Sequence, residues 1–169
     1  VTRSPLAIAA VMLGALLVTL DISFMYTAVP AISRALQQTP AASVWVVNAY
    51  HLALVAAVVP LAALGEAIGH RRVHVAGALL YTAALALCGM AESLPTLVAA
   101  RALQGVGAAA IVSVTAALVR FVYPPQSLGR GLGLYAFIVS FSLAVGPTLA
   151  STILTLLSWH WLFYLAIPL

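Results

Sequence analysis

Long apolar runs separated by short polar breaks fill the sequence. Five of them have the roughly 20 residues that a helix needs to cross a bilayer. These runs lie near residues 6–29, 43–64, 73–91, 94–119 and 131–157, and a sixth begins near residue 161. The runs lack the alternation of strands, and a segment in lipid must satisfy its own backbone hydrogen bonds, so we predict helices. The expected fold class is an all-α polytopic membrane protein.

The composition supports this prediction. Of the 169 residues, 64% are hydrophobic and 6% are charged, whereas a soluble domain has roughly 25% charged residues. All seven basic residues are arginines, and most of them flank the apolar runs. Such a pattern is typical of topology signals, so we expect the lipid bilayer and no nucleic acid as a partner.

The arginines also predict an orientation. With the N-terminus in the cytoplasm, Arg34 lies outside, Arg101 lies within the membrane, and five arginines lie inside. The inside group is Arg3, Arg71, Arg72, Arg120 and Arg130. Because basic residues are enriched on the cytoplasmic side of membrane proteins, this orientation is favoured.

Prolines suggest where the helices end or bend. We expect Pro30 to end the first helix and Pro95 to lie in a tight turn. Pro60 and Pro147 fall inside predicted spans and are expected to kink them.

Two charged residues, Asp21 and Arg101, lie inside spanning runs. A charge in a spanning helix costs roughly 3 kcal/mol on insertion scales and normally marks function. Asp21 lies nine residues before Pro30, and Arg101 lies seven residues after Leu94. At about 1.5 Å per residue, both would lie about 10–13 Å below the outer surface. We therefore predict one buried cluster, paired directly or through water, that serves as a proton or cation site; a static structural pair is the alternative.

Three further polar residues are candidates for a polar cavity. Gln104 lies one helical turn from Arg101 and extends the same stripe. Asn48 and His51 share a helix face, although an interhelical hydrogen bond is the alternative role for each. A single histidine is poor support for a metal, so we expect no metal site.

The turn between the second and third spans carries glycines and charges, at Gly65, Glu66, Gly69, Arg71 and Arg72. This pattern predicts either a charge network that closes the cytoplasmic side or a simple positive-inside anchor.

Small residues recur at every fourth position in two spans, which allows helices to approach closely in lipid. They are Gly105, Ala109 and Ser113 in the fourth span, and Ser142, Gly146 and Ala150 in the fifth. The pair formed by Gly146 and Pro147 suits a moving or sealing element, because proline removes a backbone hydrogen bond.

Together these segments resemble the major facilitator superfamily, and within it the EmrB/QacA type of drug:proton antiporter. The segments that resemble the family's motifs, in chain order, are residues 20–30, 45–50, 64–72, 101–109 and 142–147. Departures from the usual motif residues occur at Tyr26, Ala62, Glu66, His70 and the pair Ala150–Ser151.

The resemblance implies a secondary transporter that exports amphipathic, cationic drugs across the cytoplasmic membrane of a bacterial cell. Asp21 would be the proton or cation carboxylate, Arg101 its charge partner, and Gly146–Pro147 the kink that controls leak and direction. The proton gradient would supply the energy, and no cofactor is expected. A proton-coupled importer or metabolite exporter of the same superfamily, and a non-transporting membrane sensor or interaction subunit, are the alternatives.

The resemblance also implies that the chain is part of an N-terminal six-helix bundle. It begins with Val1 and ends inside an apolar run, so we expect a fragment of a longer transporter. Its partners would be a small-molecule substrate and the remaining helices of that transporter. We do not expect an enzyme, because the motifs offer no nucleophile with a base, no metal cluster and no phosphate loop.

Overall fold

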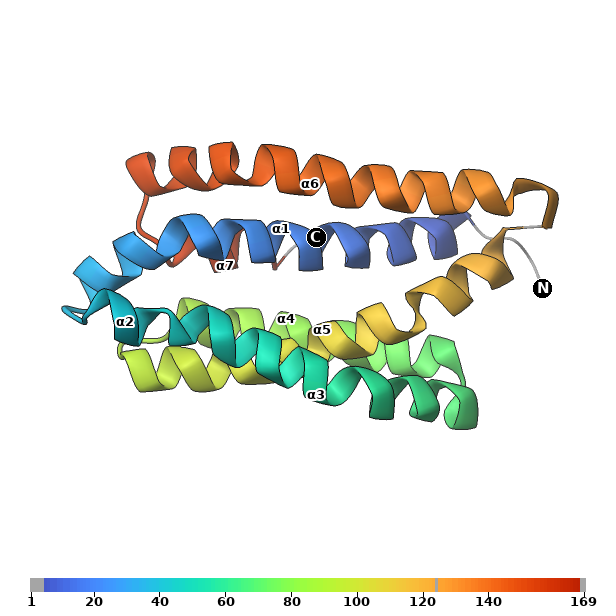
Figure 1. Cartoon of the computed structure of the whole chain (residues 1–169), viewed down its shortest axis with the longest axis horizontal. Coiled ribbons are helices and arrows are strands. Elements are labelled where there is room, and N and C mark those ends of the chain that lie inside the picture. Colours follow the sequence, from blue (N-terminus) through green and yellow to red (C-terminus); the bar gives the residue numbers. More distant parts are fainter. Residues whose placement is uncertain (1–4, 124, 168–169) are drawn as a thin grey trace.

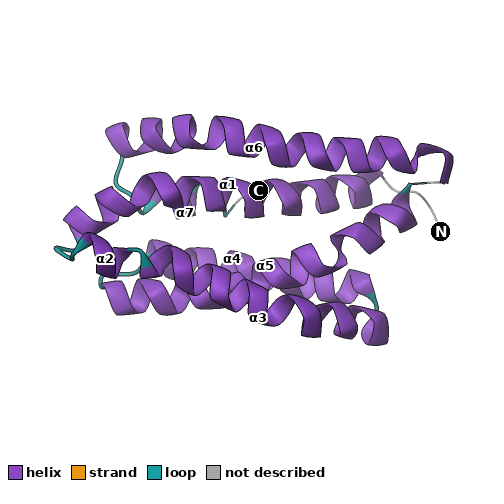
Figure 2. Ribbon diagram, in the orientation of Figure 1, coloured by secondary structure: helices purple, strands orange, loops and turns teal. Residues whose placement is uncertain are grey.

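Helices make up the described part of the chain, which comprises residues 5–123 and 125–167 in a computed structural model. No strand occurs in these ranges, and the ribbon consists of helices joined by short loops (Figure 2). In order, the elements are α1 (Pro5–Ala35), α2 (Pro40–Ser43), α3 (Trp45–Ile68), α4 (His70–Gly89), α5 (Leu94–Val122), the 3-10 helix η1 (Pro125–Ser127), α6 (Leu128–Leu156) and α7 (Trp161–Tyr164). Five helices are long and apolar enough to span a membrane, which confirms the predicted fold class.

The long helices run side by side, with α1 and α6 in one layer and α3, α4 and α5 in the other (Figure 1). Helix α5 packs against both α3 and α4, while α1 packs against α6 and also contacts α5. The contact between α1 and α5 joins the two layers. It therefore places polar residues of these helices inside the bundle.

Glycines allow the close packing around α5. A Cβ atom at Gly107 would lie 2.7 Å from the backbone nitrogen of Tyr81 on α4. A Cβ atom at Gly105 would overlap the backbone carbonyl oxygen of Tyr50 on α3. The predicted small-residue contact of the fourth span is therefore confirmed for Gly105, and it fixes α5 between its two neighbours.

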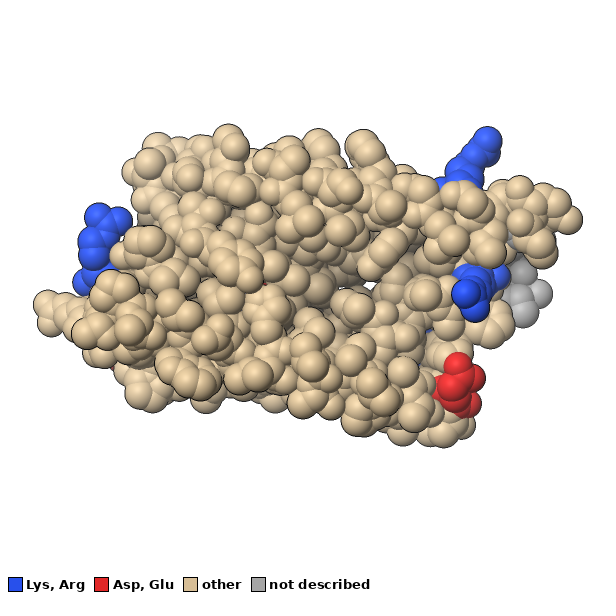
Figure 3. Space-filling view, viewed as in Figure 1, with Lys and Arg blue, Asp and Glu red and all other residues tan. Residues whose placement is uncertain are grey.

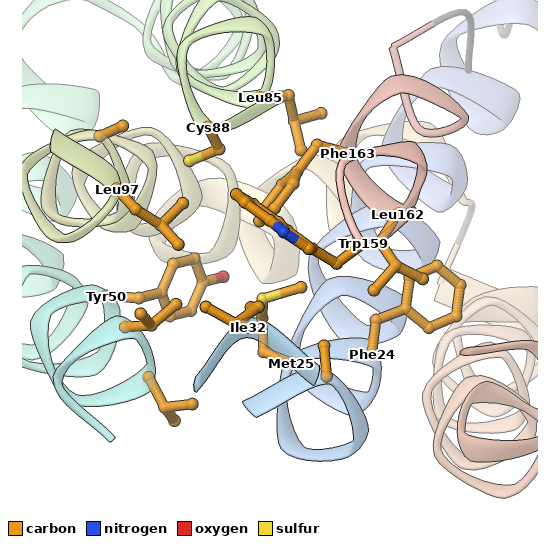
Figure 4. Packing of buried hydrophobic residues seen from close by; sticks show 14 of the residues in the cluster. Phe24, Met25, Ile32, Tyr50, Leu85, Cys88, Leu97, Trp159, Leu162 and Phe163 are labelled. Atoms are coloured by element: carbon orange, nitrogen blue, oxygen red, sulfur yellow. The ribbon is translucent and has the colours of Figure 1, made fainter. Parts of the chain in front are cut away.

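One large apolar cluster fills the interior between the layers (Figure 4). Met25 of α1, Leu85 of α4 and Phe163 of α7 are buried within it. The carbonyl oxygen of Gly89 accepts a hydrogen bond from the Tyr164 hydroxyl. Although α7 has only four residues in the described range, these contacts anchor it to the bundle.

Two predictions about prolines are wrong. Helix α1 continues through Pro30 to Ala35. Proline removes one backbone donor, and the fully buried Ala28 and Ile32 on either side hold the helix against its neighbours. Pro95 lies in the first turn of α5, where the backbone N–H would have no partner within the helix, and Ser93 caps that helix.

The other spans begin or end a few residues from their predicted limits. The second span starts with the short α2 at Pro40, and α3 runs on to Ile68. The chain turns at Gly69, whose φ of +103° favours glycine. Helices α3 and α6 remain continuous through Pro60 and Pro147.

Candidate functional site

The predicted pair of intramembrane charges forms a buried ion pair between the two layers. Nη1 of Arg101 on α5 donates to both carboxylate oxygens of Asp21 on α1, at 2.9 and 2.7 Å. The arginine is fully buried and the aspartate is 5% exposed. The predicted direct pairing is therefore confirmed. Its role in coupling stays a prediction.

Gln104 completes a triangle with these two residues. Its Oε1 accepts from Nη1 of Arg101 at 2.7 Å, and its Nε2 donates to Oδ1 of Asp21 at 3.1 Å. Cys88 of α4 lies next to it, with its Sγ 3.6 Å from the same Oε1. Because Gln104 is fully buried and bonds both charges, it extends the polar stripe as predicted.

Helix α3 supplies two contacts that the sequence reasoning missed. The carbonyl oxygen of Val46 accepts from Nε of Arg101 at 3.2 Å. The Tyr50 ring lies beneath the guanidinium, with Cζ of Arg101 4.3 Å from the ring centroid. Val46 and Tyr50 are four residues apart and thus share a helix face. Nothing in the sequence marks a backbone carbonyl such as that of Val46, so the spacing by itself does not single out Tyr50.

The cluster is balanced in charge and isolated from solvent. A buried ion pair is stabilised when hydrogen bonds satisfy both partners, and removing one partner costs about 3–5 kcal/mol. Protonation of Asp21 would cancel its charge and leave Arg101 with the neutral contacts from Gln104, Val46 and Tyr50. Protonation of Asp21 would therefore weaken the contact between α1 and α5.

Asn48 lies apart from this cluster and is exposed. It is two residues from both Val46 and Tyr50, which places it on the opposite side of α3. Nδ1 of His51 lies 2.9 Å from the carbonyl oxygen of Val47, one turn earlier on the same helix. This contact lies within α3 itself, and the cavity role of His51 and its alternative, an interhelical hydrogen bond, stay predictions.

The charges of the α3–α4 turn form a smaller network than expected. Oε1 of Glu66 lies 3.5 Å from Nε2 of His70, one turn further on. Arg71 and Arg72 are exposed, and Arg72 donates to the carbonyl oxygen of Ile68 at 3.5 Å. Within the described residues, the carboxylate of Glu66 thus contacts His70 and no arginine.

Two glycines shape this turn in different ways. Gly65 is buried inside α3, where a Cβ atom would lie 2.8 Å from both His70 and Val114. Gly69 has open space around it and adopts a positive φ. Gly65 therefore allows close packing, while Gly69 makes the turn.

The small residues of α6 face α1. Ser142 and Gly146 are buried, and a Cβ atom at Gly146 would overlap the side chain of Ser23. Pro147, the next residue along the helix, is exposed. The predicted close packing is confirmed. Ser23 follows Asp21 by two residues on α1. The contact between α1 and α6 at Gly146 and the ion pair therefore involve the same short stretch of α1.

Within residues 5–123 and 125–167, no three His, Cys, Asp or Glu side chains gather in a way that could hold a metal ion. The site is instead defined by the Asp21–Arg101 pair within a multi-pass helical membrane protein.

Comparison with known proteins identifies the family. The model of the Major Facilitator Superfamily matches residues 11–169, and the chain therefore belongs to this superfamily. It is 42% identical over 163 residues to the uncharacterized transporter YebQ of Escherichia coli (strain K12), covering 96% of this chain and 36% of that protein. It is 30% identical over 169 residues to the multidrug efflux pump LfrA of Mycolicibacterium smegmatis, covering 99% of this chain and 34% of that protein.

A further relative is the multidrug resistance protein Stp of Mycobacterium tuberculosis (strain CDC 1551 / Oshkosh), with 32% identity over 158 residues. That match covers 93% of this chain and 29% of the relative. The chain thus spans about a third of the length of these curated relatives.

Proposed function

We propose that the chain is part of a secondary active transporter that exports amphipathic, cationic drugs in exchange for protons. The observation that carries this proposal is the buried cluster of Asp21, Arg101 and Gln104. A fully desolvated charge pair in a membrane helix bundle is costly and normally marks an ion or proton pathway. The names of LfrA and Stp, a multidrug efflux pump and a multidrug resistance protein, support drugs as the substrates, and their cationic character is part of the proposal.

Asp21 is the proton carrier in this proposal. In its charged form it binds Arg101 through both oxygens and thereby holds α1 to α5. When it takes a proton, the charge attraction is lost and the contact between the helices weakens. Asp21 also lies two residues from Ser23, which packs against Gly146 of α6. Both residues belong to one stretch of α1, so a change in how this stretch binds α5 would also shift the surface that packs against α6.

The proposed orientation places the N-terminus in the cytoplasm of the cell. The α3–α4 turn and the α5–α6 connection lie at the same end of the bundle as the start of α1 (Figure 1). Basic side chains occur at both ends (Figure 3). Arg71, Arg72 and Arg120 belong to the first end, whereas Arg34 lies at the opposite end of α1. The excess of arginines supports a cytoplasmic location for the first end.

The proposal needs no cofactor, because the proton gradient supplies the energy. It includes further helices as partners, since the superfamily relatives are about three times as long as this chain. In such transporters, access alternates by the movement of one helical bundle against another around a site near the middle of the membrane.

Efflux of a cationic dye from membrane vesicles tests the proposal. The full-length gene product is compared with its Asp21→Asn and Arg101→Ala variants after equal insertion has been verified. Glu92→Gln is the matched control, because this exposed acid lies in the α4–α5 turn outside the cluster. Both cluster variants should lose efflux driven by a proton gradient, while the control retains it. Efflux at the wild-type rate in Asp21→Asn would refute the proposal.

A further inference from the structure

The contact between Tyr50 and Arg101 carries an inference beyond the ion pair. Tyr50 projects from α3 into the buried cluster, with its hydroxyl directed toward the middle (Figure 4). It is fully buried, and the guanidinium carbon lies 4.3 Å from the centroid of its ring. The face of an aromatic ring attracts a cation, and more strongly where water is excluded.

The backbone holds this ring in place. Gly105, one turn after Arg101, lies against the carbonyl oxygen of Tyr50 with no room for a side chain between the two helices. Helices α3 and α5 therefore meet at the very residue that carries the ring. The helix contact thus fixes the start of the Tyr50 side chain beside Arg101, at a point that does not involve Asp21.

The three side-chain nitrogens of Arg101 differ in their hydrogen-bond partners. Nη1 contacts Asp21 and Gln104, and Nε contacts the Val46 carbonyl. Nη2 of Arg101 and the hydroxyl of Tyr50 are buried, and neither has a hydrogen-bond partner among the described residues. Among the described contacts of Arg101, the ring of Tyr50 is thus the one that acts through an attraction for positive charge once Asp21 is neutral, since an amide and a carbonyl bind neutral donors as well.

We propose that Tyr50 is a positioning residue that keeps Arg101 in the site while Asp21 carries a proton. This inference rests on the proposed coupling role of Asp21. It predicts that the Tyr50 ring contributes more to holding Arg101 in place when Asp21 is protonated than when Asp21 is charged. The hydroxyl is not required for this role.

A thermal-stability cycle on the purified full-length protein in detergent measures this dependence. Tyr50→Leu removes the ring, Tyr50→Phe keeps it, and Asp21→Asn imitates the protonated carboxyl. Tyr50→Leu should lower the melting temperature more in the Asp21→Asn background than in the wild-type background. Tyr50→Phe should cause the same small shift in both.

Arg101→Met tests whether the effect of Tyr50→Leu depends on the charge of Arg101, because it removes the cation while leaving a long apolar side chain. In that background, the effect of Tyr50→Leu should be the same whether residue 21 is Asp or Asn. Equal effects of Tyr50→Leu in the wild-type and Asp21→Asn backgrounds would overturn the inference, even if the protein proves not to be proton-coupled.

The pH profile of efflux separates the inference from the proposed function. Tyr50→Leu should reduce efflux roughly tenfold on the acid side of the profile and less on the alkaline side, whereas Tyr50→Phe should follow the wild type. If Asp21→Asn abolishes coupling but Tyr50→Leu keeps the wild-type profile, the inference fails and the proposed function stands. If Asp21→Asn keeps the wild-type profile, the proposed function itself fails.

Discussion

Gly105 of α5 lies directly against the backbone carbonyl oxygen of Tyr50 on α3. This contact holds α5, which carries Arg101, against α3, which supplies the Tyr50 ring and the Val46 carbonyl oxygen that contact the guanidinium. A glycine is required because a Cβ atom would overlap a backbone atom, which cannot rotate away. The geometry of the charge cluster thus depends on the absence of one side chain.

The first prediction concerns this contact. Gly105→Ala should destabilise the protein by about 1–3 kcal/mol, as overpacking does in well-packed interiors. Gly133→Ala on α6 is the matched control, because a Cβ atom there meets nothing within 4 Å and alanine is the better helix former. Thermal melting of both variants in detergent checks this. Equal melting temperatures would contradict the assigned contact.

A second prediction follows from the seam between α1 and α6. Gly146→Ala should lower the melting temperature, because its Cβ atom would overlap both Oγ and Cβ of Ser23. Adding Ser23→Gly should restore part of the loss, since it removes both atoms. Ser23→Ala should restore less because the Cβ atom remains. The same result for both rescue variants would show that the clash lies elsewhere.

The third prediction isolates backbone strain at the α3–α4 turn. Gly69 has a φ of +103° and nothing within 4 Å of the position of a Cβ atom. Gly69→Ala should therefore destabilise the protein by about 1–3 kcal/mol through strain alone. Gly129→Ala, which also has open space around it and no positive φ, should be neutral. Chemical or thermal unfolding compares the two, and equal stabilities would argue against a strained turn.

Arginine is needed at position 101 for more than its charge. Arg101→Lys keeps a cation but cannot donate together to Asp21, Gln104 and the Val46 carbonyl, and it stacks less well on an aromatic ring. Hydrogen bonds to charged groups contribute about 1.5–3 kcal/mol each, so efflux should fall roughly tenfold or more. Dye efflux from vesicles measures this. Wild-type rates with lysine would show that a point charge is sufficient.

Much of the fold followed from elementary constraints on the sequence. Spanning length and the need to satisfy backbone hydrogen bonds are enough to predict the five long helices. Their ends were harder to predict, because a proline such as Pro30 removes only one donor and neighbouring helices decide whether the helix continues. Whether a glycine makes a turn or a contact also depends on its neighbours, as Gly65 and Gly69 illustrate.

The contacts of the site that depend on depth in the membrane were predictable. Those that depend on which face a helix turns inward were not. Asp21 and Arg101 fall at matching depths, which a simple rise per residue reveals. The face that α3 turns inward was not predictable, because this helix is apolar on all sides and little of it is buried. The sequence therefore indicates Asn48 as a candidate, whereas Tyr50, two residues later, is the residue that lies in the buried cluster.

Proton release on substrate binding tests the central claim most directly. The purified full-length protein is placed in weakly buffered detergent solution at a series of pH values, and a cationic dye is added at each. If Asp21 exchanges its proton for the substrate, the wild type releases protons, the Asp21→Asn variant releases none, and Glu92→Gln behaves like the wild type. Release of the same number of protons by Asp21→Asn would contradict the account and place the exchangeable proton on another residue.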